Sequence, residues 1–81
     1  MTTKIVLPKW GMGIEEGTVT QWLKAEGDTV TEGEPIVEIE TAKATQVVEA
    51  PMSGRLSKIL LVVGQTAAVN SEIGVIEERD D

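Results

Sequence analysis

The fold of this chain is decided by residues 35–50, which read PIVEIETAKATQVVEA. The two ends of this stretch, Pro35 to Glu40 and Thr45 to Ala50, are short and rich in Ile and Val, as β-strands are. Between them, Lys43 has a small residue on either side, at the midpoint of a tight turn. The stretch therefore predicts a β-hairpin with a lysine at its tip.

The rest of the chain repeats this pattern, because shifting the sequence by 37 positions lays one half over the other. The aligned pairs include Gly17 with Gly54, Leu23 with Leu60, Gly27 with Gly64, Thr29 with Thr66, Ile36 with Ile73 and Ile39 with Ile76. Gly33 in one copy and Asn70 in the other stand at a turn, and these two residue types adopt a positive φ most readily. The chain is therefore built from two similar β units.

The runs that follow Gly17 and Gly54 also fit helical spacing, but each is about ten residues long between glycines and lacks a helix cap. We therefore expect strands there, and further strands at Lys4 to Leu7 and at Gly74 to Glu77. Many short strands at even spacing predict an all-β fold, a sandwich or flattened barrel. The two copies predict internal pseudo-two-fold symmetry.

The symmetry also predicts where the parts of the molecule lie. Adding 37 to the residue numbers of the turn at 41–44 reaches the C-terminus, and subtracting 37 reaches the first strand. In the second copy, the two chain ends therefore stand where the first copy has a closed hairpin. We expect the hairpin tip and the termini at opposite ends of the domain, with Pro8 to Glu16 near the tip. The large apolar side chains of Trp22, Leu23 and Ile59 are expected near the core.

Composition excludes several kinds of chemistry. The 81 residues suffice for one small domain and include no His and no Cys, which excludes imidazole bases, thiolate nucleophiles and Cys/His zinc sites. Glu38 and Glu40 alternate with Val37 and Ile39, which favours the polar face of a sheet over a catalytic acid and base pair. The acidic residues form no loop of alternating cation ligands, so we expect no metal site.

Charge and hydropathy limit the partners. A formal net charge of −7 opposes binding to nucleic acid, and two Trp without Phe or Tyr offer few aromatic faces for stacking bases. The longest apolar stretch, Ile59 to Val63, is far shorter than the roughly 20 residues that a membrane span needs. We expect a cytoplasmic domain that binds neither nucleic acid nor membrane.

Lys43 is the candidate functional residue. At a hairpin tip its side chain is expected to point into solvent, where most lysines only keep the surface soluble. Its place at the apex of one copy of a duplicated unit, in a chain with no other candidate site, favours a special role as an anchoring point.

Four motifs resemble the lipoyl domains of 2-oxo acid dehydrogenase complexes, and the similarity covers nearly the whole chain. The motifs are PKWGMGIEEGTV at residues 8–19, WLKAEGD at 22–28, ETAKAT at 40–45 and APMSG at 50–54. Gly27 precedes Lys43 by sixteen positions and Gly54 follows it by eleven, as in that family. Ala42 is a departure, since many relatives have an acidic residue there. The resemblance implies two four-stranded antiparallel sheets.

The resemblance also implies a function. In that family the lysine at the hairpin tip is joined through an amide to lipoic acid, and by this match it is Lys43. The domain would be a non-catalytic carrier whose swinging arm moves acyl groups and electrons between a thiamin-diphosphate-dependent decarboxylase, an acyltransferase core and a dihydrolipoyl dehydrogenase. A lipoate ligase or lipoyltransferase would attach the cofactor.

The parent protein implied is the dihydrolipoyl acyltransferase of a 2-oxo acid or acetoin dehydrogenase complex. Residues 1–78 would form the lipoyl domain, a monomer in isolation, and 79–81 the start of a linker or a frayed C-terminus. In lipoyl domains the loop before the second strand helps the decarboxylase recognise the domain. Trp10, Met12 and Ile14 are therefore candidate contacts, together with Glu40 beside the arm.

Two alternatives stay open. Biotinyl carrier domains are close relatives, but they have Met on both sides of their lysine, where this chain has Ala42 and Ala44. A β-sandwich binding module without a prosthetic group would explain the fold and the charge, and would leave Lys43 unmodified. The mass of the protein after exposure to lipoate ligase distinguishes these alternatives.

Overall fold

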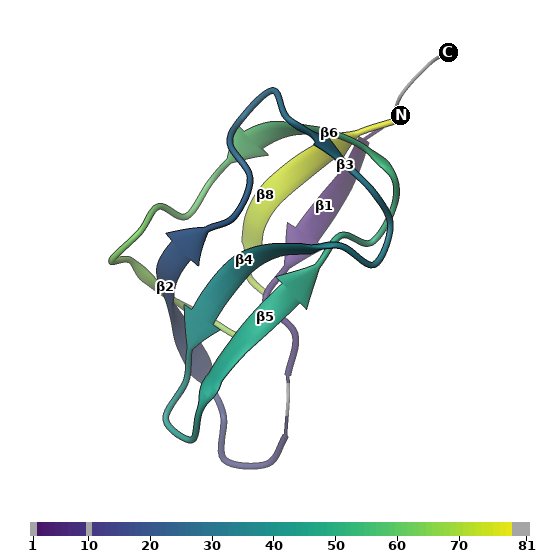
Figure 1. The fold of residues 1–81 in the computed structure, drawn as a ribbon. Helices are drawn as coiled ribbons and strands as arrows, with labels where there is room; N and C mark the ends of the chain where they lie inside the picture. The colour runs from purple at the N-terminus through teal and green to yellow at the C-terminus, as the bar shows by residue number, and fades with distance from the viewer. Residues whose placement is uncertain (1, 10, 79–81) are drawn as a thin grey trace.

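The computed structural model describes residues 2–9 and 11–78, and its regular secondary structure is entirely β (Figure 1). The strands are β1 (Thr2–Val6), β2 (Glu16–Trp22), β3 (Thr29–Val30), β4 (Pro35–Glu40), β5 (Thr45–Glu49), β6 (Gly54–Ile59), β7 (Thr66–Ala68) and β8 (Glu72–Glu77). They form two four-stranded antiparallel sheets with the strand orders β1-β8-β6-β3 and β5-β4-β2-β7. The predicted all-β sandwich is confirmed. The described residues contain no helix that could span a membrane.

The strand boundaries differ from the expected ones by one or two residues, except for β4, which was predicted in full. β5 ends at Glu49 because Ala50 turns away to bond the β3–β4 loop, its N–H donating to the Glu34 carbonyl at 2.9 Å. Leu7 leaves β1 in the same way, donating to the Ser71 carbonyl at 2.9 Å. β5 and β1 therefore end in equivalent contacts, and their acceptors Glu34 and Ser71 are 37 positions apart.

The helical spacing noted in the sequence comes from matching β-bulges. The register shifts between Val19 and Gln21 in β2, and between Leu56 and Lys58 in β6, so one extra residue interrupts each ladder. Such a residue breaks the alternation of faces, and side chains three apart then point the same way. The extra residues are Thr20 and Ser57, which are 37 positions apart.

Each half of the chain completes the sheet of the other half. β3, from the first copy, pairs with β6, and β7, from the second copy, pairs with β2. The loop contacts repeat as well: Gly27 N–H donates to the Leu56 carbonyl at 2.7 Å, and Gly64 N–H donates to the Val19 carbonyl at 2.8 Å. Both donors and both acceptors are 37 positions apart. The hydrogen bonds between the two halves thus follow the same pseudo-two-fold symmetry as the sequence repeat.

A single apolar core lies between the two sheets. Its buried members are Ile5, Leu7, Val19, Val30, Ile36, Val37, Ile39, Val48, Ala50, Leu56, Ile73 and Ile76. Trp22 and Ile59 are half-buried against this core, as expected. Leu23 is 42% exposed, and its predicted burial is wrong. Trp22 ends β2 with its side chain inward, and the next residue of an extended chain points to the opposite side.

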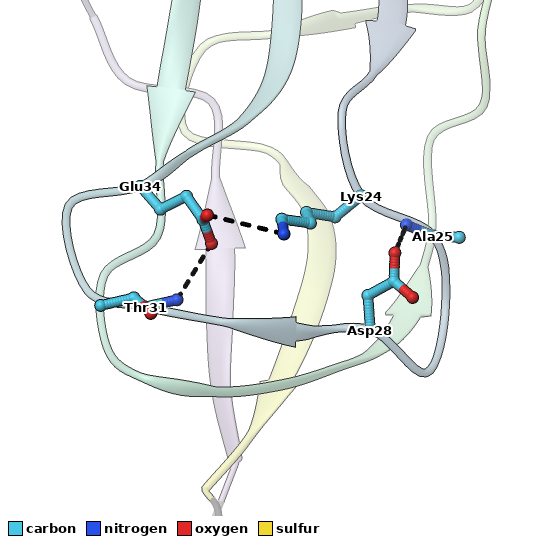
Figure 2. A network of polar contacts seen from close by, with 5 residues as sticks. All are labelled: Lys24, Ala25, Asp28, Thr31 and Glu34. Atoms are coloured by element: carbon cyan, nitrogen blue, oxygen red, sulfur yellow. Dashed lines mark hydrogen bonds and ion pairs between the residues drawn. The ribbon is translucent and has the colours of Figure 1, made fainter.

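A small polar network holds the loops on either side of β3 (Figure 2). Glu34 accepts a hydrogen bond from Thr31 N–H at 3.1 Å, and its other carboxylate oxygen lies 3.5 Å from Lys24 Nζ. Asp28 accepts from Ala25 N–H at 2.9 Å, which closes the β2–β3 loop. Glu34 precedes β4 at the end of that strand opposite to the hairpin turn, so this network stabilises the scaffold away from the tip.

The β4–β5 hairpin tip and the outer ends of β1 and β8 lie at opposite ends of the elongated molecule (Figure 1). Thr2 pairs with Glu77, which places the start of β1 beside the end of β8. The loop between β1 and β2 lies next to the hairpin tip. Both placements were predicted from the repeat. The expectation for residues 79–81 lies outside the described residues.

Candidate functional site

The turn between β4 and β5 places Lys43 at the tip of the molecule. Glu40 and Thr45 form the last pair of the β4–β5 ladder, and the four residues 41–44 connect them. Thr41 N–H donates to the Ala44 carbonyl at 2.9 Å, which closes the turn. Ala42, Lys43 and Ala44 are all exposed. The lysine thus stands between two small, exposed residues at the end of the hairpin.

The amine of Lys43 has one hydrogen-bond partner among the described residues. Its Nζ donates to the backbone carbonyl of Met12 at 3.0 Å. Gly13 has a φ of 83° and no side chain, and a Cβ placed there would lie 3.7 Å from both Cε and Nζ of Lys43. The β1–β2 loop therefore supports the lysine stem through its backbone and leaves the amine accessible.

The other expected recognition residues lie in different environments. The Met12 side chain is 87% exposed beside the lysine, and Glu40 is exposed at the end of β4. Ile14 is only 5% exposed, so its side chain supports the loop from inside and offers little surface to a partner. Trp10 lies outside the described residues. The structure thus brings Met12 and Glu40 to the same end of the molecule as Lys43.

A shallow acidic groove of about 350 Å³ lies next to the turn. Glu15, Glu16 and Glu40 line it, together with Thr41 and Ala42 of the turn itself. In the described residues, no Asp or Glu forms an ion pair with Lys43, and no three potential metal ligands gather into a site. In the described residues, the site therefore combines an amine that forms no ion pair with an acidic surface beside it.

Thr41 is a residue of the site that the sequence patterns did not single out. It is 9% exposed, and its hydroxyl donates to the Ala44 carbonyl at 2.6 Å. The same oxygen accepts from Ala44 N–H at 3.2 Å and from Lys43 N–H at 3.4 Å. A Ser or Thr where a strand meets a tight turn is a known signal of such side-chain-to-backbone bonds. That signal was present in the sequence.

The arrangement can hold a covalent group. A primary amine at the tip of a rigid hairpin is a nucleophile for an activated carboxyl group, and the resulting amide extends the side chain into an arm. The chain has no His and no Cys to supply a base or a second nucleophile.

Comparison with known proteins identifies the family of this site. The sequence profile of the biotin/lipoyl family, described as "Biotin-requiring enzyme", matches residues 3–76. The dihydrolipoyllysine-residue acetyltransferase component of the acetoin cleaving system of Cupriavidus necator is 43% identical over 89% of this chain and 19% of its own length. The dihydrolipoyllysine-residue succinyltransferase component of the 2-oxoglutarate dehydrogenase complex of Rickettsia conorii is 44% identical over 96% of this chain and 20% of its own. The chain thus spans about a fifth of these curated relatives.

Solved structures agree with this assignment. The lipoyl domain of the 2-oxoglutarate dehydrogenase complex of Azotobacter vinelandii superposes with a TM-score of 0.74 at 33% identity, and covers 93% of this chain and 95% of its own. The urea carboxylase of Kluyveromyces lactis contains a similar fold, with a TM-score of 0.81 at 26% identity over 95% of this chain and 6% of that protein. The sequence relatives favour the lipoyl branch over the biotinyl one.

Proposed function

This chain is a lipoyl domain of the biotin/lipoyl family, and from that premise we propose that Lys43 is the residue that carries its lipoic acid. Lipoyl domains carry this cofactor on a lysine. The observation that supports Lys43 is its position at the exposed tip of the β4–β5 turn, at the end of the molecule opposite to the outer ends of β1 and β8 (Figure 1). A linker that continues from β8 would leave the tip free.

The residues around Lys43 fit a lipoyl group. Ala42 and Ala44 are exposed and small, so no neighbouring side chain in the turn blocks the amine. Attachment must break or bend one hydrogen bond, the one from Nζ to the Met12 carbonyl at 3.0 Å. The amide that forms retains one N–H, which can donate to the same carbonyl. Modification is thus compatible with the loop conformation described here.

The attachment reaction balances as an acyl transfer. The Lys43 ammonium group first gives one proton to solvent or to the modifying enzyme. The resulting neutral amine attacks the carbonyl carbon of an activated lipoyl donor, the C–N bond forms, and the bond from that carbon to the leaving group breaks. The attacking nitrogen loses a proton to solvent or to the modifying enzyme. Because the ammonium charge disappears, the formal net charge of the domain becomes one unit more negative than −7. When bound, the lipoyl dithiolane supplies a disulfide that accepts an acyl group together with two electrons.

The partners follow from the complexes in which the relatives take part. We extend the proposal to a parent protein of the dihydrolipoyllysine acyltransferase type, located in the cytoplasm. Its lipoyl arm would exchange acyl groups and electrons with a thiamin-diphosphate-dependent decarboxylase, an acyltransferase core and a dihydrolipoyl dehydrogenase. A tethered arm keeps the cofactor at a high effective concentration at each active site. Met12 and Glu40, both exposed beside Lys43, are the proposed contacts for the decarboxylase.

The test is a mass measurement on the unmodified domain after incubation with lipoate ligase, lipoic acid and ATP. The wild type should gain one lipoyl group, and Lys43→Ala should gain none. Lys24→Ala is the matched control, since Lys24 lies in the β2–β3 loop away from the tip, and it should be modified at the wild-type rate.

A second variant moves the lysine by one position. Lys43→Ala combined with Ala44→Lys should remain folded but unmodified, because the amine then leaves the turn from a different position. A parallel incubation with biotin ligase and biotin tests the alternative carrier. Lipoylation of Lys43→Ala, or biotinylation in place of lipoylation, would contradict the proposal.

A further inference from the structure

The turn that presents Lys43 lacks the residue types and backbone conformations that usually define the shape of a turn. None of residues 41–44 is a glycine or a proline, and none has a positive φ. Ala42 and Ala44 have no polar side chain, and the Lys43 side chain extends away to the Met12 carbonyl. A turn of this composition is compatible with several backbone conformations. Its observed shape must therefore come from hydrogen bonds.

Thr41 supplies those hydrogen bonds from inside the turn. Its backbone N–H and its hydroxyl both donate to the Ala44 carbonyl, at 2.9 and 2.6 Å. The hydroxyl oxygen also accepts from the backbone N–H groups of Lys43 and Ala44, at 3.4 and 3.2 Å. In the described part of the chain, this hydroxyl is the only partner of the Lys43 N–H. One oxygen atom thus contacts the lysine's own peptide group and the residue after it.

The burial of Thr41 strengthens the hydrogen bonds of its hydroxyl. Thr41 is 9% exposed, whereas the three residues that follow it are exposed. Water competes less for a buried hydroxyl than for an exposed one, so the hydrogen bonds of a buried hydroxyl restrain the backbone more effectively. The hydroxyl accepts from the N–H groups of both peptide planes that flank the Lys43 Cα, at 3.4 and 3.2 Å, and so restrains the backbone from which the lysine side chain extends. Loss of the hydroxyl would free those planes but keep the backbone hydrogen bond between Thr41 and Ala44.

We propose that Thr41 is a positioning residue for the modification of Lys43: its hydroxyl fixes the direction of the lysine, so that the amine meets the activated lipoyl donor in the modifying enzyme. This inference rests on the proposed function. The hydroxyl touches neither the amine nor the donor, and it acts through the backbone of Lys43. The modifying enzyme would thus recognise the shape of the turn rather than a charged neighbour, which agrees with the presence of Ala42 beside the lysine.

The experiment compares lipoylation rates of three single variants in the unmodified domain. Thr41→Val removes the hydroxyl and keeps the side-chain shape, while Thr41→Ser keeps the hydroxyl and removes the methyl group. Thr45→Val is the matched control, because Thr45 lies at the start of β5, is exposed, and has no side-chain hydrogen bond in the described structure. Lipoate ligase, lipoic acid and ATP are supplied, and intact mass gives kcat/KM.

Thr41→Val should lower kcat/KM about tenfold, the equivalent of losing one buried hydrogen bond. Thr41→Ser and Thr45→Val should stay within about twofold of the wild type, less than the change expected from one hydrogen bond. Amide hydrogen exchange should accelerate at Lys43 and Ala44 in Thr41→Val and stay unchanged in the core strands. If Thr41→Val does not fold, Thr41→Ala, which introduces no new atoms into the turn, replaces it.

Two results would overturn the inference: modification of Thr41→Val at the wild-type rate, or equal losses in Thr41→Val and Thr41→Ser. A failure of the proposed function is a different result, because the wild type itself would then remain unmodified. The comparison among folded variants therefore separates the role of Thr41 from the identity of the attachment site.

Discussion

Replacing Gly54 by Ala tests the close packing of β6 against the end of β8. Gly54 begins β6 and faces the end of β8. A Cβ at this position would collide with the Glu77 carbonyl oxygen and would lie 2.9 Å from Ile76 Cγ2. A side chain can rotate away from such a contact, but a carbonyl bound into a sheet cannot. The backbone of β8 would have to move.

The size of the effect follows from two opposing contributions. Overpacking a core costs about 1–3 kcal/mol, and the upper end applies here because backbone blocks the new methyl group. Loss of glycine's freedom in the unfolded chain returns about 0.4–1 kcal/mol. The net destabilisation is therefore roughly 2 kcal/mol, which lowers the melting temperature of a domain of this size by about 8–16 °C. Circular dichroism during thermal unfolding measures it.

Gly11→Ala is the matched control for Gly54→Ala. Among the described residues, no atom outside its chain neighbours lies within 4 Å of a Cβ built at Gly11. The same chemical change should therefore leave stability unchanged or raise it by up to about 1 kcal/mol. A Gly54→Ala protein that melts at or above the wild-type temperature would refute the packing argument.

Two further predictions concern single contacts of the scaffold. Trp22→Phe removes the indole N–H that donates to the Leu61 carbonyl at 2.8 Å, and should lower the free energy of unfolding by about 1 kcal/mol in urea denaturation, with an unchanged m-value. Asn70 has a φ of 71°, so Asn70→Ala should cost about 1 kcal/mol in the same assay, because the short polar side chain of Asn tolerates the left-handed region better than the methyl group of Ala does. Asn70→Gly should be close to neutral; a loss as large as that of Asn70→Ala would contradict the turn geometry.

Much of the fold could be predicted because the two halves of the sequence can be compared with each other. The glycine at position 33 and the asparagine at position 70 were expected at equivalent turns, and both have a positive φ. The prediction for Leu23 was wrong because it treated the apolar run as continuous. The bulge at Thr20 and the end of β2 at Trp22 change which way each side chain points, and neither feature is visible in composition.

The candidate site was only partly predictable, because some of its contacts join segments that are distant in the sequence. Lys43 is a local feature, a lysine between small residues in a turn, and a local pattern can indicate it. The approach of Met12 to Lys43 joins residues 31 positions apart, and it depends on how β1 and β4 are placed in their sheets. Thr41 was overlooked because its signal is weak until its burial is known.

The amino-acid order alone therefore determined the hairpin, the duplication, the glycine and asparagine turns, and the placement of a lysine far from the chain ends. These depend on short-range backbone preferences and on repetition, which can be recognised along the chain. Only the tertiary structure decided that β3 pairs with β6 of the second half and β7 with β2 of the first half. It also decided that the Met12 carbonyl accepts a hydrogen bond from the Lys43 amine. Such pairings form between distant segments through backbone N–H and C=O groups, which hardly differ from one residue to the next. Which of these groups meet is therefore decided only when the core has packed.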